Sequence, residues 1–257
     1  MALTTVRPQG MGFVTGRRNM VINGAMQVAQ RGTSATALGN GNSGYHTVDR
    51  WRFTEGGSGT FQFTMSQSTT APEGFASSLK LNCTTAQTSL DSDLQLRLMH
   101  RIEGQNLQHL KFGTSSAESF TLSFWVRSNL TGTYVVHIFL ADDSASASKT
   151  YTIDAANTWE HKTITFSGDQ TSIIDNDNGI GAQVSFVLLA GTNYTTGTSN
   201  TEFSDSATAV DRAAGQTVNL ASSTSNEWYV TGIQLEVGTN ASDFEHRSFG
   251  EELSLCQ

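Results

Sequence analysis

Apolar and polar residues alternate along most of the chain with the period of two that is typical of β-strands. The clearest example is residues 119–128, where the apolar side chains at even positions from Phe120 to Val126 fall on one face. A second run, residues 133–140, follows a turn at Gly132 and predicts a hairpin with the first. Further strands are expected over residues 47–53, 60–66, 78–82, 93–102, 150–153, 159–166, 183–189 and 227–237.

No stretch with a helical period exceeds about two turns. The roughly ten to twelve expected strands, separated by frequent turn signals, predict an all-β protein with a jelly-roll-like antiparallel β-sandwich. The sandwich is expected over residues 45–247, after an N-terminal attachment arm and its lead-in over residues 1–44 and before a C-terminal tail over residues 248–257. Within this frame, residues 33–44 are expected to form a loop and residues 105–110 a short helical turn.

The first 18 residues carry scattered apolar side chains that Gly and Pro interrupt, so they cannot form a long regular element. We interpret them as an extended arm. Its apolar side chains would be poorly protected on a monomer, which favours docking onto another protein or a sister subunit, and the alternative is a disordered tail. The candidate attachment residues are Leu3, Val6, Met11, Phe13 and Val14.

Charged residues make up only 15% of the chain, and the net charge is −8. A negative net charge disfavours nucleic-acid binding, which depends on clustered Lys and Arg. Arg17 and Arg18 come nearest to such a cluster, and a solvated or interface pair is the simpler interpretation. No stretch approaches the roughly 18 apolar residues that span a bilayer, and the start lacks a secretion signal, so membrane insertion is not expected.

Residues that often carry chemistry form no catalytic or metal-binding motif. Cys83 and Cys256 lie far apart, and we expect neither a disulfide nor a metal site from them, in keeping with synthesis in a reducing cytoplasm. The acids and histidines lack the spacings that mark a catalytic nucleophile or a bound metal, and His137 and His161 are expected to be packed or satisfied within strands. The chain is therefore expected to be no enzyme and to need no cofactor.

The run from Asp175 to Gly179 has the oxygen-bearing side chains that begin a calcium loop. The acid that should close such a loop is missing, because Phe186 occupies its position. An Asx-rich turn is the favoured interpretation, and a calcium site is the minority one.

The two ends of the chain carry motifs that are moderately specific alone and strong together. The first end has Asn-x-x-Ile-Asn-Gly at residues 19–24, Gln-Arg-Gly at residues 30–32 and Asp-Arg-Trp at residues 49–51. The other end has Gly-Ile-Gln-Leu-Glu-Val-Gly at residues 232–238 and Phe-Glu-His-Arg at residues 244–247. On these motifs, residues 19–256 resemble a family of bacteriophage virion proteins, found in tail fibres and related appendages, whose middle resembles a carbohydrate-binding β-sandwich.

This resemblance implies a structural protein of the phage virion, assembled in the host cytoplasm. It implies a tail-fibre or tail-tip component that contacts host surface polysaccharide, with the arm bound to other virion proteins. A homotrimer is also implied, in which several weak sugar sites act together. The alternative is a capsid decoration, head fibre or connector protein that binds no sugar. Family members usually continue past the Leu-Cys-Gln end, so a few residues are expected to follow Gln257.

Sugar-binding sandwiches stack an aromatic ring on a pyranose while Asn, Asp, Gln or Arg side chains bind its hydroxyls. Aromatic residues in polar loops are therefore the candidates, and the long, apolar-poor stretch 191–226 is expected to form a variable surface. The candidate glycan contacts are Tyr45, Trp159, Asn193, Tyr194 and Phe203. The alternative for the tryptophans is that they fill the core, which applies to Trp51, Trp125, Trp159 and Trp228.

Overall fold

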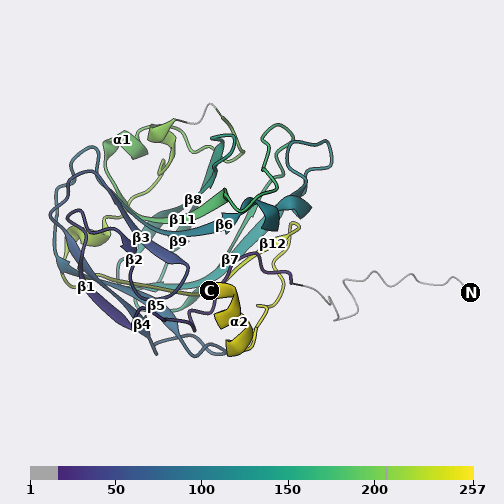
Figure 1. Cartoon of the computed structure of the whole chain (residues 1–257). Helices are drawn as coiled ribbons and strands as arrows, with labels where there is room; N and C mark the ends of the chain where they lie inside the picture. The colour runs from purple at the N-terminus through teal and green to yellow at the C-terminus, as the bar shows by residue number, and fades with distance from the viewer. Residues whose placement is uncertain (1–16, 206–207) are drawn as a thin grey trace, which may run out of the picture.

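Two six-stranded antiparallel sheets face each other in the computed structural model, which describes residues 17–205 and 208–257 (Figure 1). In spatial order the first sheet consists of β1 (Ser34–Leu38), β4 (Gln62–Ser68), β5 (Ser78–Thr85), β12 (Glu227–Val237), β7 (Phe120–Ser128) and β10 (Glu160–Phe166). The second consists of β2 (Gly44–Tyr45), β3 (Trp51–Gly56), β6 (Gln95–Glu103), β11 (Ile180–Ala190), β8 (Gly132–Leu140) and β9 (Ser146–Ile153).

This order is that of a jelly roll. The strands β5, β12, β7 and β10 lie side by side in one sheet, and β6, β11, β8 and β9 do so in the other, so the chain passes repeatedly between the two layers. Every strand pair is antiparallel. The predicted fold class, a jelly-roll-like antiparallel β-sandwich, is confirmed. The candidate attachment residues Leu3, Val6, Met11, Phe13 and Val14 lie outside the described part of the chain.

Helices are short and peripheral. Six are described: η2 (Gly104–Asn106), η3 (Gln108–Leu110), α1 (Thr192–Thr195), η4 (Ala209–Asp211), η5 (Leu220–Ser222) and α2 (Phe249–Cys256). The first two form the helical turn expected over residues 105–110. Of the described helices, none has the length and apolar character that crossing a membrane requires.

The core forms where the inward side chains of the two sheets meet. The even positions of β7 from Phe120 to Val126 are at most 2% exposed, as the alternation predicts. Trp51 and Trp228 are fully buried, so for these two the core-filling interpretation holds. Trp125 and Trp159 are only half-buried. Close aromatic contacts such as Phe124 against Phe186, with centroids 5.0 Å apart, tie the sheets together.

The segment before β1 is part of the sandwich from residue 17 onward. Val21 and Met26 are fully buried, and the Met20 amide donates to the Leu235 carbonyl on β12 (2.9 Å). Residues 34–38, expected as part of a loop, instead form β1, which pairs with β4 along an edge of the first sheet. Figure 1 shows this lead-in beside the C-terminal helix α2.

The long segment after β11 folds back over the second sheet. The Ser148 amide on β9 donates to the Asn200 carbonyl (2.6 Å), and the Ser148 hydroxyl donates to the Arg212 carbonyl (3.0 Å). Ala213 packs against Val135 and Val187 on the outward side of β8 and β11. The segment therefore covers part of the outer face of the second sheet, where the candidate site lies.

Candidate ligand-binding face

The outer face of the second sheet carries a row of mostly polar side chains that crosses all six strands. Trp51, Leu98 and Phe186 point into the core, so their neighbours in the strands point outward. From β9 to β2 the residues that pair in register are Ser148, His137, Ser185, Met99, Arg52 and Tyr45. We term them the polar row. Neighbouring strands lie about 4.8 Å apart, so the row spans roughly 24 Å.

Four half-buried arginines share this face and form the arginine cluster: Arg52 on β3, Arg97 and Arg101 on β6, and Arg212 in the segment that crosses the sheet. Arg52 donates to the Thr54 hydroxyl (2.8 Å), and Arg212 donates to the Gln95 side-chain oxygen (3.1 Å). Across residues 17–205 and 208–257, no acidic side chain forms an ion pair with any of the four. The cluster is therefore a local excess of positive charge on an acidic protein.

The arginine cluster also holds hydrogen-bond donors without acceptors. The Nε atoms of Arg97, Arg101 and Arg212 are buried and have no partner among the residues that the structure describes. Burial, and after it repulsion by Arg212, lowers the pKa of Arg97 to about 10. The side chain stays protonated at neutral pH, so its charge persists. An anion with oxygen acceptors that contacts the accessible parts of these guanidinium groups would relieve their mutual repulsion.

His137 lies within the polar row and is only 3% exposed. Burial, followed by the charges of Arg212 and Arg97, holds the pKa of His137 well below its usual value, so the ring is neutral. Its Nδ1 and the hydroxyl of its row neighbour Ser185 have no hydrogen-bond partner. His137 is thus packed, as expected, although its Nδ1 has no hydrogen-bond partner among the described residues. The row contains neutral polar groups whose hydrogen-bonding capacity is unused.

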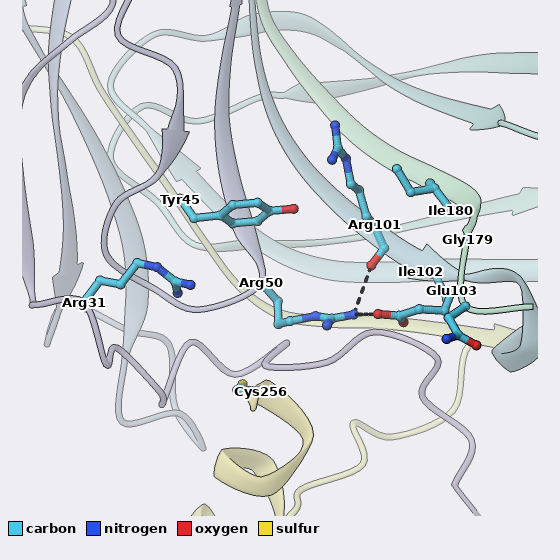
Figure 2. Close-up of a pocket in the computed structure, with 10 residues that line it drawn as sticks. Arg31, Tyr45, Arg50, Arg101, Ile102, Glu103, Gly179, Ile180 and Cys256 are labelled. Atoms are coloured by element: carbon cyan, nitrogen blue, oxygen red, sulfur yellow. Dashed lines mark hydrogen bonds and ion pairs between the residues drawn. The ribbon is translucent and has the colours of Figure 1, made fainter.

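A pocket of about 280 Å³ opens at the β2, β3 and β6 end of this face (Figure 2). Its lining includes Arg31, Tyr45, Arg50, Arg101, Glu103 and Cys256. Arg50 donates to Glu103 (2.6 Å), and although burial opposes the effect, this bond holds the pKa of Glu103 below its ordinary value. Figure 2 shows the hydroxyl end of Tyr45 turned toward the Arg101 side of the pocket. Arg101 thus connects the pocket to the arginine cluster.

The pocket wall also includes the turn that resembled the start of a calcium loop. Asn178 and Gly179 line the pocket, and the Gly179 amide donates to Asp177 Oδ1 (2.7 Å). This hydrogen bond forms an Asx turn, so the favoured interpretation of residues 175–179 is confirmed.

Three of the five candidate glycan contacts lie on or beside this face. Tyr45 ends the polar row on β2, and the Arg31 guanidinium lies 5.9 Å from its ring centroid. Tyr194 lies in α1, which follows β11, and its ring packs near Val135 and Val187, while Arg212 lies 5.2 Å from its centroid. Asn193, its exposed neighbour, is anchored through its amide to the Ser92 carbonyl (2.9 Å).

Trp159 belongs to the opposite sheet. Its ring contacts Tyr229 on the outer face of the first sheet, with centroids 6.1 Å apart. The Tyr229 ring is only 4% exposed, because Lys80 (5.2 Å) and Arg127 (4.8 Å) cover it. Both cations are already engaged, Lys80 by Glu227 (2.6 Å) and Arg127 by the Asn157 carbonyl (2.9 Å). These two cations of the first sheet are therefore already held by groups of the protein.

Phe203 lies in neither place. Its ring is half-buried and packs against three phenylalanines, with centroid distances of 5.4 Å to Phe112, 6.1 Å to Phe120 and 6.3 Å to Phe166. It closes one end of the core between the sheets. The five candidates therefore do not converge on a single site.

The arginine cluster was not among the residues predicted from the sequence. The sequence pattern could have indicated two of its members. Arg97 and Arg101 are an even number of residues apart in a strand whose Leu96 and Leu98 face the core. Even spacing in a strand puts both side chains on the outer face. No comparable pattern marks Arg212, which reaches the cluster only because the segment around it folds across the sheet.

No protein-family model matches the chain, and no curated protein matches it either. Among solved structures, it is similar to the enzymatically active domain of tailspike protein 4 of bacteriophage CBA120, with 13% identity, a TM-score of 0.43 and 85% of this chain covered. The match spans only 21% of the tailspike chain.

It is also similar to two carbohydrate-binding modules from Clostridium thermocellum. The family 11 module of a cellulosomal cellulase matches with 10% identity and a TM-score of 0.39, covering 80% of this chain and 97% of the module. A family 22 module matches with 11% identity and a TM-score of 0.36, covering 82% and 97%. These similarities concern the fold alone.

Proposed function

We propose that this chain is a structural component of a phage virion, in a tail fibre or tail tip, that binds host surface glycans through the outer face of its second sheet and does not cleave them. The observation that carries the binding proposal is the unneutralised arginine cluster beside the polar row. The terminal motifs within residues 19–51 and 232–247, which resemble those of phage appendage proteins, support placement in the virion.

The face has the properties that recognition of a sugar chain requires. Arg97 and Arg101, both half-buried, lie roughly 13 Å apart along β6, a distance that several linked sugars can span. Half-buried guanidinium groups present several N–H donors in a fixed plane, and their accessible N–H groups can bind a ligand that supplies acceptors. Tyr45 at one end provides an aromatic ring for contact with a pyranose.

Attachment to the particle belongs to the same proposal. The N-terminal arm would bind other virion proteins through Leu3, Val6, Met11, Phe13 and Val14, and the chain would form a homotrimer. A trimer brings three copies of the face to one cell surface, so a single site needs only weak affinity. Assembly would take place in the host cytoplasm.

The test is binding of the purified full chain to an array of bacterial capsular and lipopolysaccharide glycans, with its mass in solution measured in parallel. We expect saturable binding to at least one glycan, a roughly tenfold weaker affinity in Arg97→Gln, equivalent to about 1.4 kcal/mol, and recovery of the glycan at unchanged length. The matched control is Arg127→Gln on the first sheet, which should bind as the parent does. A well-folded protein that binds no glycan would instead favour a capsid decoration or connector role.

A further inference from the structure

We infer that the ligand of this face is an anionic polysaccharide, one whose sugars carry carboxylate or phosphate groups at intervals along the chain. This inference rests on the proposed function and specifies the chemical class of the glycan. The arginines in this region of the molecule differ in whether an acid neutralises them.

Arginines next to the cluster are neutralised by acids. Arg31 forms an ion pair with Asp49 (2.8 Å), and Arg50 forms one with Glu103 (2.6 Å). Both pairs lie at the pocket, within a few residues of Arg52 and Arg101. The described acids thus pair with the two arginines that line the pocket and leave the four of the cluster without a counter-charge. The other described cations without an ion pair, Arg18, Arg127 and Lys149, lie apart from one another, so the largest group of unneutralised cations is on the outer face of the second sheet.

That charge is unusual for this protein. The whole chain has a net charge of −8, so most of its surface repels an anion. Burial makes an unpaired cation costly, and the lowered pKa of Arg97 reflects both its burial and its repulsion by Arg212. A bound anion would remove both penalties. A neutral glycan would satisfy some donors but would leave the repulsion in place.

The distribution of the arginines favours a polymer over a small anion. Arg97 and Arg101 are four residues apart on one strand, which separates them by roughly 13 Å along β6. Arg52 projects from β3 beside Met99, between those two positions, and Arg212 reaches the face from the crossing segment. The positive groups therefore lie at intervals across the sheet instead of converging on one point. A chain with repeated negative charges can contact several of them at once.

At the edge of the face, Tyr45 lines the pocket and offers an aromatic ring for contact with a pyranose. A nucleic acid carries a phosphate at every nucleotide, so the acidic remainder of the surface would oppose it more strongly than a sugar chain that carries charges at intervals. The observations therefore favour a charged sugar chain over a nucleic acid.

The experiment varies the charge of the ligand first and the charge of the protein second. Polygalacturonate, alginate, polysialic acid and a phosphorylated teichoic-acid-type polymer are immobilised, and each uronate or sialate polymer is paired with its carboxyl-reduced, neutral form. Binding of the full chain is measured at low and high salt, with a single-stranded DNA as a further arm. The variants are Arg97→Gln/Arg101→Gln, the charge-retaining Arg97→Lys/Arg101→Lys, and Arg127→Gln as the control.

We expect at least one charged polymer to bind, and its affinity to fall at least tenfold on carboxyl reduction or phosphate removal and in Arg97→Gln/Arg101→Gln. The Lys variant should retain part of the binding, and high salt should weaken it. The carboxylate and phosphate arms identify which anion the face recognises.

Three outcomes would overturn the inference. Equal binding to the charged and neutral forms would refute the anionic ligand while leaving glycan binding intact. Equal or tighter binding to DNA, lost in the same Gln variant, would make the face a nucleic-acid site. Binding to none of the polymers, charged or neutral, or to the wider glycan array would remove the proposed function as well.

Discussion

The side chain of Asn23 is fully buried and joins separate stretches of chain near the N-terminus. Its Nδ2 donates to the carbonyls of Val28 (2.8 Å) and Asp49 (2.9 Å), and its Oδ1 accepts from the Val28 amide (3.0 Å). The Trp51 indole donates to the Asn23 carbonyl (3.1 Å). Asn23 has a φ of 59°, a conformation that Asn tolerates better than most residues. The hydrogen bonds therefore join three residues of the N-terminal motifs and stabilise the fold: Asn23, Asp49 and Trp51.

His100 gives the stability of the protein a defined pH dependence. Its ring is fully buried, and Nε2 lies within hydrogen-bonding distance of both the nitrogen (3.3 Å) and the oxygen (3.1 Å) of Ile22. Burial, followed by the nearby charge of Arg50, lowers the pKa of His100 from 6.5 to about 3. Below about pH 6.5 the unfolded chain binds a proton at this site and the folded protein does not. Stability is therefore greatest above that pH and falls as the pH falls toward 3.

Between about pH 7 and pH 5, this one residue should reduce the free energy of unfolding by about 2 kcal/mol. His137, whose pKa is also lowered by burial, acts in the same direction. Urea denaturation across this pH range provides the measurement, with His100→Gln showing a shallower slope than the parent. A free energy of unfolding that stays constant from pH 7 to pH 5 would contradict the assignment of a neutral, buried His100.

At the residue level, period-two patterning predicted burial well but could not rank the tryptophans. Trp51 and Trp228 alternate with polar neighbours and are core residues, whereas Trp159 lies just before β10 and is half-buried on the outside of the sandwich. Whether a charged side chain forms an ion pair depends on residues that are distant in the sequence. Arg50 and Arg52 differ because Glu103 lies beside Arg50, whereas none of the described acids pairs with Arg52.

At the scale of elements, the two ends of the chain form one unit against β12. Asn19 donates through Nδ2 to the Ile233 carbonyl (3.0 Å) and accepts at Oδ1 from the Leu235 amide (3.0 Å). Arg247, before α2, donates to the carbonyls of Asn19 and Val21. Glu245 accepts from the Asn19 amide (2.7 Å). The motifs at opposite ends of the sequence are thus in direct contact.

Gly24 is required for this contact. A Cβ atom at residue 24 would lie 2.1 Å from the Ile233 carbonyl oxygen, so an alanine must push the lead-in away from β12. The hydrogen bond from the Ile233 amide to the Gly24 carbonyl (3.0 Å) would be strained or lost. We expect Gly24→Ala to reduce the free energy of unfolding by about 2–4 kcal/mol, measured by denaturant titration.

The matched control for that substitution is Gly250→Ala in α2. A Cβ there would meet nothing within 4 Å, so stability should be unchanged or slightly increased. If Gly24→Ala and Gly250→Ala have equal effects, close packing of the lead-in against β12 is refuted.

Among the elements, the strands with clear alternation were predictable and the edge strand β1 was not. Its residues, Ser34 to Leu38, are mostly exposed and carry a single fully buried side chain, so no periodicity marks them. Their pairing with β4 comes from the tertiary fold. The path of residues 191–205 and 208–216 across the second sheet was unpredictable for the same reason. It is fixed by contacts of the crossing segment with β8, β9 and β11, such as Asn200 with Ser148 and Tyr194 with Val187.

At the scale of the whole molecule, the two outer faces differ in how their cations are partnered. On the first sheet, Lys80 and Arg127 are engaged by neighbours and cover Tyr229. On the second, the arginine cluster has no acidic partner within the described residues. The outer face of the second sheet therefore carries more unpaired arginine charge than that of the first.

The most direct test of the account is to observe which arginines a bound glycan touches. The side-chain Nε–Hε signals of the ¹⁵N-labelled protein would be followed by NMR while a binding polysaccharide fragment is titrated. We expect the signals of Arg97 and Arg101, whose Nε atoms have no partner in the free protein, to shift with the ligand, and that of Arg127 on the first sheet to stay in place. Shifts at Arg127 with none at Arg97 and Arg101 would place the ligand on the other sheet and contradict the account.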